Sequence, residues 1–187
     1  AEDIVERCHG QPATVEETSK KSTKGAPPLY DLTLLQREAN SRFGFSAKNT
    51  LSIAQALYER HKLITYPRTD SRCLPEDYLP TVEKVVARQR EWQYGRFAAE
   101  ALSKKYIRKD KRIFDNRKVS DHFAIIPTAS LPKTLSDAEL KIYQMIVQRF
   151  LATFFPAAVY HNTRRLSLVA GETFLTEGKI LVEPGWK

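Results

Sequence analysis

Tyr66 and Arg68 are the residues of this chain whose types and spacing best suit a chemical reaction. They lie in residues 63–71, LITYPRTDS, where a short apolar run ends in a tyrosine that is followed by proline and arginine. Proline favours extended backbone in the residue before it, and residues two apart in an extended chain point to the same side. The phenol could therefore attack an anionic phosphate that the guanidinium holds. On these residues alone, the favoured interpretation is instead a tyrosine buried in a corner between a strand and a turn.

A histidine and a basic run supply further polar candidates downstream. His122 precedes an apolar run, where a lone histidine is more often structural than catalytic. Residues 104–118 hold eight Lys or Arg against two Asp, and apolar residues interleave with them: Tyr106, Ile107, Ile113 and Phe114. Such a run is either a solvated charged face or a surface that contacts phosphates and stacks aromatic rings on bases. Composition alone leaves both interpretations open.

Composition narrows the class of protein. A chain of 187 residues that is 42% apolar suffices for one ordinary domain, or for one compact domain with part of another. The net charge of +8 favours an anionic partner, and nucleic acid before a membrane surface. No apolar run approaches the roughly 20 residues that a membrane span needs. Cys8 and Cys73 and the scattered histidines form no disulfide framework or metal-ligand spacing, so we predict no metal site in this chain and a reducing compartment.

The elements that must position the candidate residues are predicted to be mostly helical. Apolar periodicity predicts helices over residues 29–43, 46–61, 82–92, 97–106 and 136–155. The first has Thr33 or Asp31 as its cap and ends at Gly44, and the last begins with a capping box at Ser136 and Glu139.

Strand-like patterns lie near both ends of the chain. Residues 166–170 alternate as in a half-buried strand, and turns are expected at 171–172 and 177–178. Residues 1–28 are predicted to be irregular, with a weak strand at 13–18 and a basic linker at 20–28. The expected fold class is therefore α+β: a mainly helical domain, residues 29–155, inserted between β segments at 1–28 and 156–187. Because the chain has no initiator methionine and stops after an apolar run, we expect a fragment of a longer protein.

Residues 63–71 resemble the active-site signature of type IA DNA topoisomerases, with proline after the tyrosine as in the topoisomerase III branch. Other segments are similar to that family in the same order: residues 27–39, 45–58, 121–128, 143–150 and 178–186. Agreement at several ordered places is far more specific than one motif. The resemblance implies that the helical block is the family's domain III and that the flanking segments belong to domain II, an arch that lets domain III lift away.

The resemblance also implies an activity: cleavage and religation of single-stranded DNA through a 5′-phosphotyrosine intermediate, which allows strand passage. Tyr66 matches the family's nucleophile. Arg68 is expected to favour the phenolate and to hold charge on the scissile phosphate. His122 matches a histidine that donates to the phosphate region, whereas the next position, often a second histidine in topoisomerase III enzymes, is Phe123.

Weaker expectations concern residues around this centre. Lys48, Lys118 and Arg112 are predicted to contact the DNA backbone. Thr69, Asp70 and Ser71 are expected to fix the loop, and Asp70 could also orient Arg68. These positions complete the predicted site.

The resemblance further implies what this chain lacks. The family's Toprim domain carries a catalytic glutamate, an acidic magnesium site and a lysine, and no acidic cluster of that kind occurs here. We therefore expect no cofactor in this chain, and Mg²⁺ for the full-length enzyme through the Toprim domain. The expected partners are single-stranded DNA and the remaining domains of the parent enzyme, in a monomeric, cytoplasmic protein that is nucleoid-associated or plasmid-encoded.

Two expectations concern the isolated chain, and a Tyr66-dependent covalent DNA adduct, formed when the chain is mixed with its missing N-terminal part, would separate this interpretation from its rival. The isolated chain should not relax supercoiled DNA, and it should bind single-stranded DNA weakly, with salt sensitivity, through residues 104–118. The alternative function is a non-enzymatic, single-stranded-DNA-binding helical module, which explains the charge but not the ordered motifs.

Overall fold

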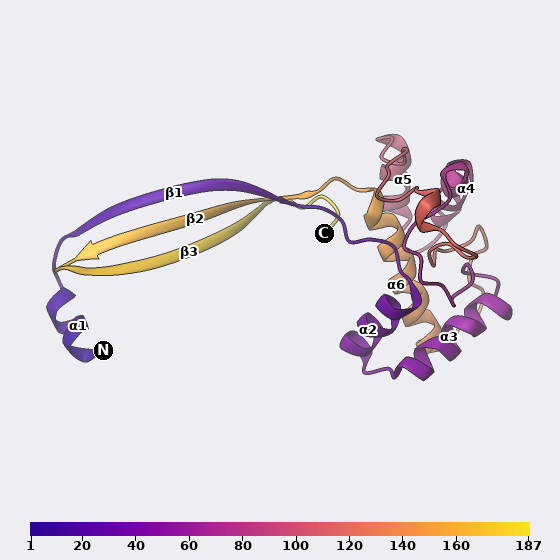
Figure 1. The fold of residues 1–187 in the computed structure, drawn as a ribbon, viewed down its shortest axis with the longest axis horizontal. Coiled ribbons are helices and arrows are strands. Elements are labelled where there is room, and N and C mark those ends of the chain that lie inside the picture. The colour runs from indigo at the N-terminus through magenta and orange to yellow at the C-terminus, as the bar shows by residue number, and fades with distance from the viewer. The chain divides into compact units, whose positions relative to one another are not determined.

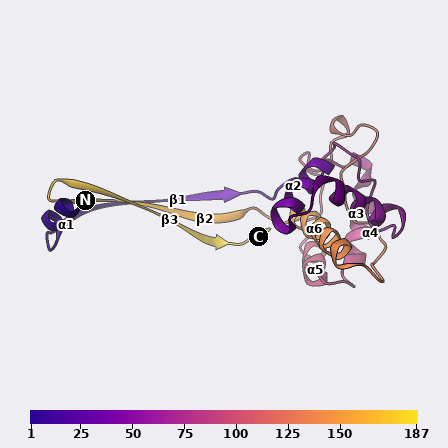
Figure 2. The ribbon, with the colours of Figure 1, turned by 90° about the horizontal axis from the view of Figure 1, so that it is seen from below.

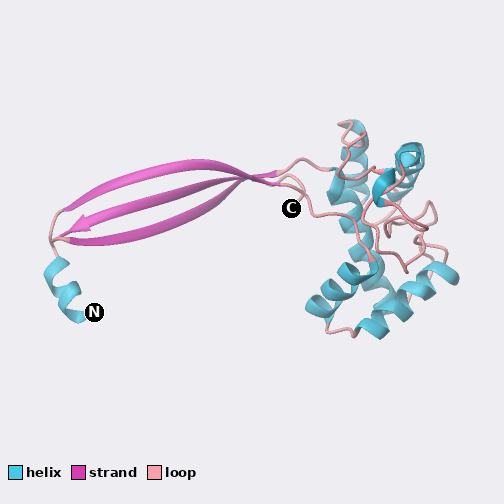
Figure 3. Cartoon of the chain, viewed as in Figure 1, coloured by secondary structure: helices cyan, strands magenta, loops and turns pink.

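The computed structural model describes all 187 residues, which form two compact units. One unit combines Ala1–Gly25 with Ala157–Lys187, and the other comprises Ala26–Pro156. All three strands lie in the first unit, and every helix except the first lies in the second (Figure 3). The α+β class expected from the sequence is confirmed. No helix is both long and apolar enough to cross a membrane.

The first unit is built on a three-stranded antiparallel sheet in the order β1-β2-β3 (Figure 2). Its strands are β1 (Ala13–Lys24), β2 (Ala158–Val169) and β3 (Glu172–Glu183), and the helix α1 (Glu2–Cys8) precedes them. Ala170 and Gly171 connect β2 to β3 with positive φ angles of 49° and 84°. Positive φ at both central residues is what a tight two-residue hairpin requires.

Three sequence expectations for this unit are wrong. The helix α1 replaces an irregular segment, β1 continues through residues 20–24 of the predicted linker, and β3 passes through Gly178 where a turn was expected. The reason lies in β2, which pairs along its length with both neighbours, Lys20 with Asn162 and Gly178 with Thr163 among them. Continuous backbone pairing with β2 outweighs the local turn and linker preferences of these residues.

The second unit is helical, and α6 passes between other helices (Figure 1). The helices α3 and α5 both pack on α6, while α2 packs on α3 and α4 on α5. The bounds are α2 (Leu32–Phe43), α3 (Ala47–Glu59), α4 (Leu79–Gln89), α5 (Gly95–Ser103) and α6 (Asp137–Phe154), with short 3₁₀ turns η1 (Glu76–Tyr78) and η2 (Asn116–Lys118).

Side-chain caps define where α2, α3 and α6 begin. The Asp31 carboxylate accepts from the Leu34 amide at 2.6 Å, so α2 starts at Leu32 and Asp31, rather than Thr33, is the cap. The predicted capping box of α6 is confirmed: the Glu139 amide donates to Ser136 Oγ at 3.3 Å and the Ser136 amide donates to Glu139 Oε2 at 2.9 Å. Each such cap satisfies amides that the helix itself leaves unpaired.

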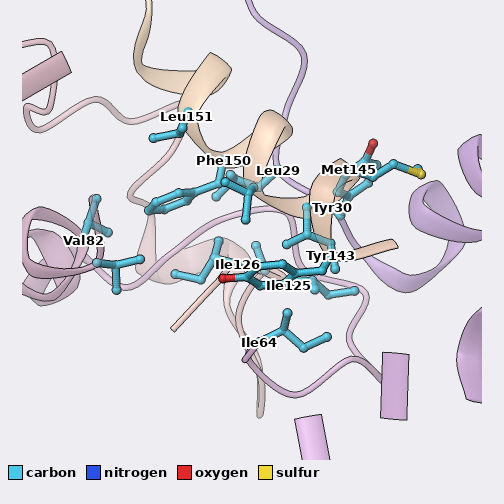
Figure 4. Packing of buried hydrophobic residues seen from close by; sticks show 14 of the residues in the cluster. Leu29, Tyr30, Ile64, Val82, Ile125, Ile126, Tyr143, Met145, Phe150 and Leu151 are labelled. Carbon is cyan, nitrogen blue, oxygen red and sulfur yellow. The ribbon is translucent and has the colours of Figure 1, made fainter. Parts of the chain in front are cut away.

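The core of the second unit contains three non-helical segments as well as helix faces. Tyr30, Ile64 and Ile125 are almost fully buried alongside Tyr143 and Phe150 of α6 (Figure 4). Backbone bridges join Tyr30 to Ile125 and Ile64 to Pro127. The segment before Tyr66 is therefore held in the core by both packing and backbone pairing.

The apolar residues of the basic run belong to this core. Ile107, Ile113 and Phe114 are only 8%, 4% and 2% exposed, and the Tyr106 ring packs 5.2 Å from that of Phe155. The interpretation that these residues form a stacking surface for bases is therefore wrong. They anchor a charged loop to the core, and its Lys and Arg side chains lie on the surface.

Candidate active site

The segment that leads to Tyr66 lies antiparallel to the segment that follows His122. The Thr65 amide donates to the Ile126 carbonyl at 3.0 Å, and the Thr128 amide donates to the Leu63 carbonyl at 2.9 Å. Thr65 Oγ1 also donates to the Ala124 carbonyl at 2.9 Å. The pairing is an isolated bridge rather than a full strand, but it gives Tyr66 the extended approach that its proline neighbour favours.

The residues after Tyr66 are tied to the same neighbouring loop. Thr69 Oγ1 donates to the carbonyl of His122 at 3.2 Å and accepts from the Ser71 amide at 3.1 Å. Ser71 Oγ donates to the Lys118 carbonyl at 2.6 Å. Thr69 and Ser71 therefore fix the loop, as expected from the sequence, and both are buried.

Aromatic rings flank Tyr66. The His122 ring lies 4.2 Å from the Tyr66 ring, centroid to centroid, at an angle of 44°. Tyr58 of α3 makes an edge contact with Tyr66 at 5.4 Å, and the Lys62 amino group lies 5.7 Å from the centre of the Tyr58 ring. Tyr66 is half-buried whereas His122 is exposed, so the phenol is confined by its neighbours but still reachable from solvent.

Arg68 is anchored by an amide that the sequence did not single out. Two Arg68 N–H donors face the Gln55 side-chain amide, so its oxygen is assigned to that side. In this orientation the Gln55 oxygen accepts from Arg68 Nη2 at 3.2 Å and from Arg68 Nε at 3.3 Å. Asp70 forms no ion pair with Arg68, so the expectation that Asp70 orients it is wrong. Gln55 and Tyr58 are three residues apart on α3 and thus share a face. This spacing is the sequence feature that could have indicated that both side chains reach the Tyr66 site.

The three predicted backbone-contact residues lie in different surroundings. Lys48 is exposed in the first turn of α3, two turns before Gln55. Lys118 Nζ lies 3.7 Å from Asp115, and Arg112 Nη2 lies 2.7 Å from Asp110. Lys118 and Arg112 are thus partly neutralised by neighbouring carboxylates, whereas Lys48 has no ion pair.

These ion pairs shift the proton affinities of the acids involved. The Arg117 guanidinium, which hydrogen-bonds to Asp115, lowers the pKa of that carboxyl to about 2. The hydrogen bond from Arg112 likewise lowers the pKa of Asp110 and raises that of Arg112 itself. The two carboxylates of the basic run, Asp110 and Asp115, are therefore ionised and paired with neighbouring arginines at neutral pH.

The donor set does not fit a magnesium site. No group of three or more His, Cys, Asp or Glu side chains is placed to hold a metal ion. Because Mg²⁺ binds through carboxylate oxygens and water, no step of the chemistry below passes through a metal held by this chain.

The whole chain, residues 1–187, matches a protein family described as DNA topoisomerase, and it belongs to that family. It is 45% identical to DNA topoisomerase 3 of Bacillus subtilis and 46% identical to that of Bacillus cereus, in each case over 98% of this chain and 26% of the relative. The chain thus spans about a quarter of the length of these curated relatives. The resemblance to type IA enzymes of the topoisomerase III branch is confirmed.

A solved structure shares the fold. The full-length topoisomerase I from Thermotoga maritima superposes with a TM-score of 0.69 at 26% identity, over 99% of this chain and 30% of that one. Family membership favours part of an enzyme over an independent binding module. The individual roles of Tyr66, Arg68 and His122 remain predictions, as do those of the three backbone-contact residues.

Proposed function

We propose that this chain supplies the DNA-cleaving tyrosine of a type IA topoisomerase, with Tyr66 as the nucleophile. One observation supports this most directly: Tyr66 lies against His122 and is tied on both sides, through Thr65 and Thr69, to the loop that carries His122. Tyr66 is also half-exposed beside an exposed imidazole, so that a substrate can reach both rings from solvent.

In the proposed reaction the Tyr66 oxygen attacks a phosphodiester of single-stranded DNA. The bond from Tyr66 Oη to phosphorus forms, the bond from phosphorus to the 3′ oxygen breaks, and the phenolic proton is transferred to the departing 3′ oxygen. A phenol with an ordinary pKa near 10 is a weak nucleophile at neutral pH, so the positive charge of Arg68 serves to favour the phenolate and the phosphate charge. His122 donates a hydrogen bond to the phosphate.

Religation follows from the same chemistry in reverse. The phosphotyrosyl bond conserves the energy of the phosphodiester, so that the 3′-hydroxyl can reseal the break without a nucleotide cofactor. Between the two steps a second strand passes through the gap. We propose that magnesium, where the full-length enzyme uses it, is held by residues outside this chain.

The two units suggest how this chain would contribute to strand passage. We assign the helical unit to the tyrosine-bearing domain III and the sheet to part of the domain II arch. The division of the chain supports this assignment, because the backbone crosses between the units only at residues 25–26 and 156–157. Two crossings allow one unit to move as a body while the chain stays continuous. We further propose that the full-length protein acts as a monomer in the cytoplasm.

A covalent-adduct assay on the full-length enzyme tests the nucleophile. Single-stranded DNA labelled at its 3′ end transfers label to protein when a 5′-phosphotyrosine forms. Tyr66→Phe should abolish labelling, whereas the matched control Tyr58→Phe, which keeps the ring beside Tyr66, should retain it. Labelling that persists in Tyr66→Phe would refute the assignment.

A relaxation assay tests the division of labour. The isolated 187-residue chain with magnesium should leave a negatively supercoiled plasmid unrelaxed, because its residues do not fit the acidic magnesium site. Relaxation by the isolated chain that Tyr66→Phe removes would contradict this expectation.

A further inference from the structure

The sheet of the first unit presents a row of cations on one face. Lys20 of β1 pairs with Asn162 of β2, which pairs with Lys179 of β3. Directly paired residues of antiparallel strands project from the same face, and strands lie about 4.8 Å apart. The two lysines therefore flank Asn162 on one face, roughly 10 Å apart at their Cα atoms. Arg164, two residues along β2, extends the same face.

An open hollow of about 680 Å³ lies over this row. Its lining is predominantly cationic, hydroxyl-bearing or amide-bearing: Thr18, Lys20, Lys21, Ser22, Asn162, Thr163, Arg164, Glu177, Gly178 and Lys179. All of these residues belong to the sheet strands β1, β2 and β3 (Figure 1). Glu177 is the only acid among them.

The cations of the hollow are not neutralised by ion pairs. In this unit the ion pairs join Arg7 to Asp3 and Glu172, and Arg165 to Glu17. None involves Lys20, Lys21, Arg164 or Lys179. The Lys179 amino group instead lies 4.3 Å from the centre of the Tyr160 ring, and an aromatic ring attracts a cation without cancelling its net charge.

Neutral donors complete the lining. Asn162 Nδ2 donates to Ser22 Oγ at 2.6 Å, so the Ser22 hydroxyl, having accepted, keeps its own proton free to donate elsewhere. Cations beside hydroxyl and amide donors are the groups that proteins present to phosphate oxygens.

The distribution of charge distinguishes this face from the basic run of residues 104–118. Four of the eight cations in that run are paired with carboxylates: Lys104 with Glu100, Arg112 with Asp110, and Arg117 and Lys118 with Asp115. The sheet unit has equal numbers of basic and acidic residues, yet most of its acids precede Lys20 along β1 and α1. Its positive charge is therefore concentrated toward one end of the sheet.

We propose that this hollow binds the phosphodiester backbone of nucleic acid, as a contact separate from the Tyr66 site. Lys20, Arg164 and Lys179 would neutralise phosphates, and Ser22 and Asn162 would position them. No aromatic side chain lines the hollow, and its one side-chain amide, Asn162, already donates to Ser22 Oγ, so we expect binding that is independent of base sequence. The proposal goes beyond the cleavage chemistry because it assigns a nucleic-acid contact to the sheet.

Salt titration of the 187-residue chain tests the proposal. Binding of a fluorescein-labelled 20-nucleotide single strand, and of the corresponding duplex, is measured by anisotropy between about 50 and 200 mM KCl. The variant Lys20→Gln/Lys179→Gln removes two unpaired cations from the hollow. Two lost phosphate contacts should reduce the slope of log K against log salt by about 1.4 for the single strand or about 1.8 for the duplex.

Matched variants separate this effect from net charge and folding. Arg7→Gln/Arg165→Gln removes the same charge from cations that are already paired with acids, and it should leave the slope near the wild-type value. Lys20→Arg/Lys179→Arg keeps the charge and should keep the slope, and circular dichroism checks the sheet in each variant. The proposal is supported if the salt slope for the single strand or the duplex falls in Lys20→Gln/Lys179→Gln and in neither of the other two variants.

Contrary results are equally clear. Equal slopes for the two glutamine pairs on both DNAs, or a slope lost in the arginine pair, would overturn the proposal. The nucleophile assignment is tested by the covalent adduct of Tyr66→Phe, and the sheet contact by the salt slope of the Lys20 and Lys179 variants, so failures of the two proposals appear in different measurements.

Discussion

The imidazole of His122 lies 4.2 Å, centroid to centroid, from the phenol of Tyr66, although the two residues are far apart in the chain. Hydrogen bonds from the two flanking threonines to the His122 loop, in addition to the ring contact, hold the two residues together. Thr65 Oγ1 donates to the Ala124 carbonyl and Thr69 Oγ1 to the His122 carbonyl, so hydrogen bonds bracket Tyr66 on both sides. Removing the imidazole should therefore change the chemistry of the site more than its geometry.

His122→Ala should slow DNA cleavage by the full-length enzyme about 100-fold, the cost of losing one donor to a developing charge. Thermal stability should change little, because the side chain is exposed. Single-turnover cleavage of a labelled oligonucleotide measures the rate. His122→Gln retains a donor and should recover part of it, and a wild-type rate in His122→Ala would remove His122 from the proposed mechanism.

Gln55→Ala should slow cleavage about tenfold, because a hydrogen bond to a charged group such as Arg68 contributes about 1.5 kcal/mol. The informative measurement is a double-mutant cycle with Arg68→Ala. If Gln55 acts by positioning the guanidinium, its substitution adds nothing once Arg68 is gone. Additive losses in the cycle would show that Gln55 acts independently of Arg68.

Arg149→Ala should destabilise the helical unit by about 3 kcal/mol, the lower end for breaking a buried ion pair. Arg149 is 11% exposed, pairs with Glu38, and donates to the Pro28 carbonyl at 3.0 Å and to Tyr30 Oη at 3.3 Å. The Glu38 side chain is largely buried, and the Arg149→Ala substitution leaves the Glu38 carboxylate without the more buried of its two arginine partners. Urea denaturation followed by circular dichroism measures the change.

A second arginine on the same carboxylate provides the control. Arg42 also pairs with Glu38, but its side chain is 48% exposed. Exposed ion pairs contribute about 1 kcal/mol or less, so Arg42→Ala should be nearly neutral. Equal losses from the two variants would contradict the view that burial makes the Arg149 contact the important one.

Asp115→Asn should remove an acid-sensitive part of the folding stability. Because Arg117 lowers the pKa of Asp115 from 3.8 to about 2, the ionised carboxylate stabilises the fold above pH 3.8, and this contribution is lost as the pH falls through 2. The free energy of unfolding of Asp115→Asn should therefore lie below wild type at pH 7, and the two should converge near pH 2.

Denaturation at a series of pH values measures this convergence. The exposed Asp77, which forms no ion pair, supplies the control variant Asp77→Asn, with stability near wild type at pH 7. A stability difference between wild type and Asp115→Asn that stays constant down to pH 2 would refute the linkage to the Asp115 carboxyl.

Much of the local structure and the family could be predicted from the sequence. The ordered motifs around residues 63–71 identify the topoisomerase family, and apolar periodicity with the cap at Gly44 and the box at Ser136 places the long helices to within a few residues. These features depend on interactions within one or two turns of chain. The sequence also nominates Tyr66 and Arg68 as the reacting pair, but Pro67 and Arg68 lie in a bend rather than in the extended segment that was expected.

Only the tertiary structure decided the remaining relationships. Gln55 rather than Asp70 anchors Arg68, Phe114 enters the core rather than the surface of the basic run, and β3 continues through Gly178. Each outcome depends on partners distant in sequence, which supply hydrogen bonds, apolar contacts or a pairing strand that local pattern does not contain. The sequence by itself determined which residues could react, and the tertiary contacts determined which side chains stand beside them.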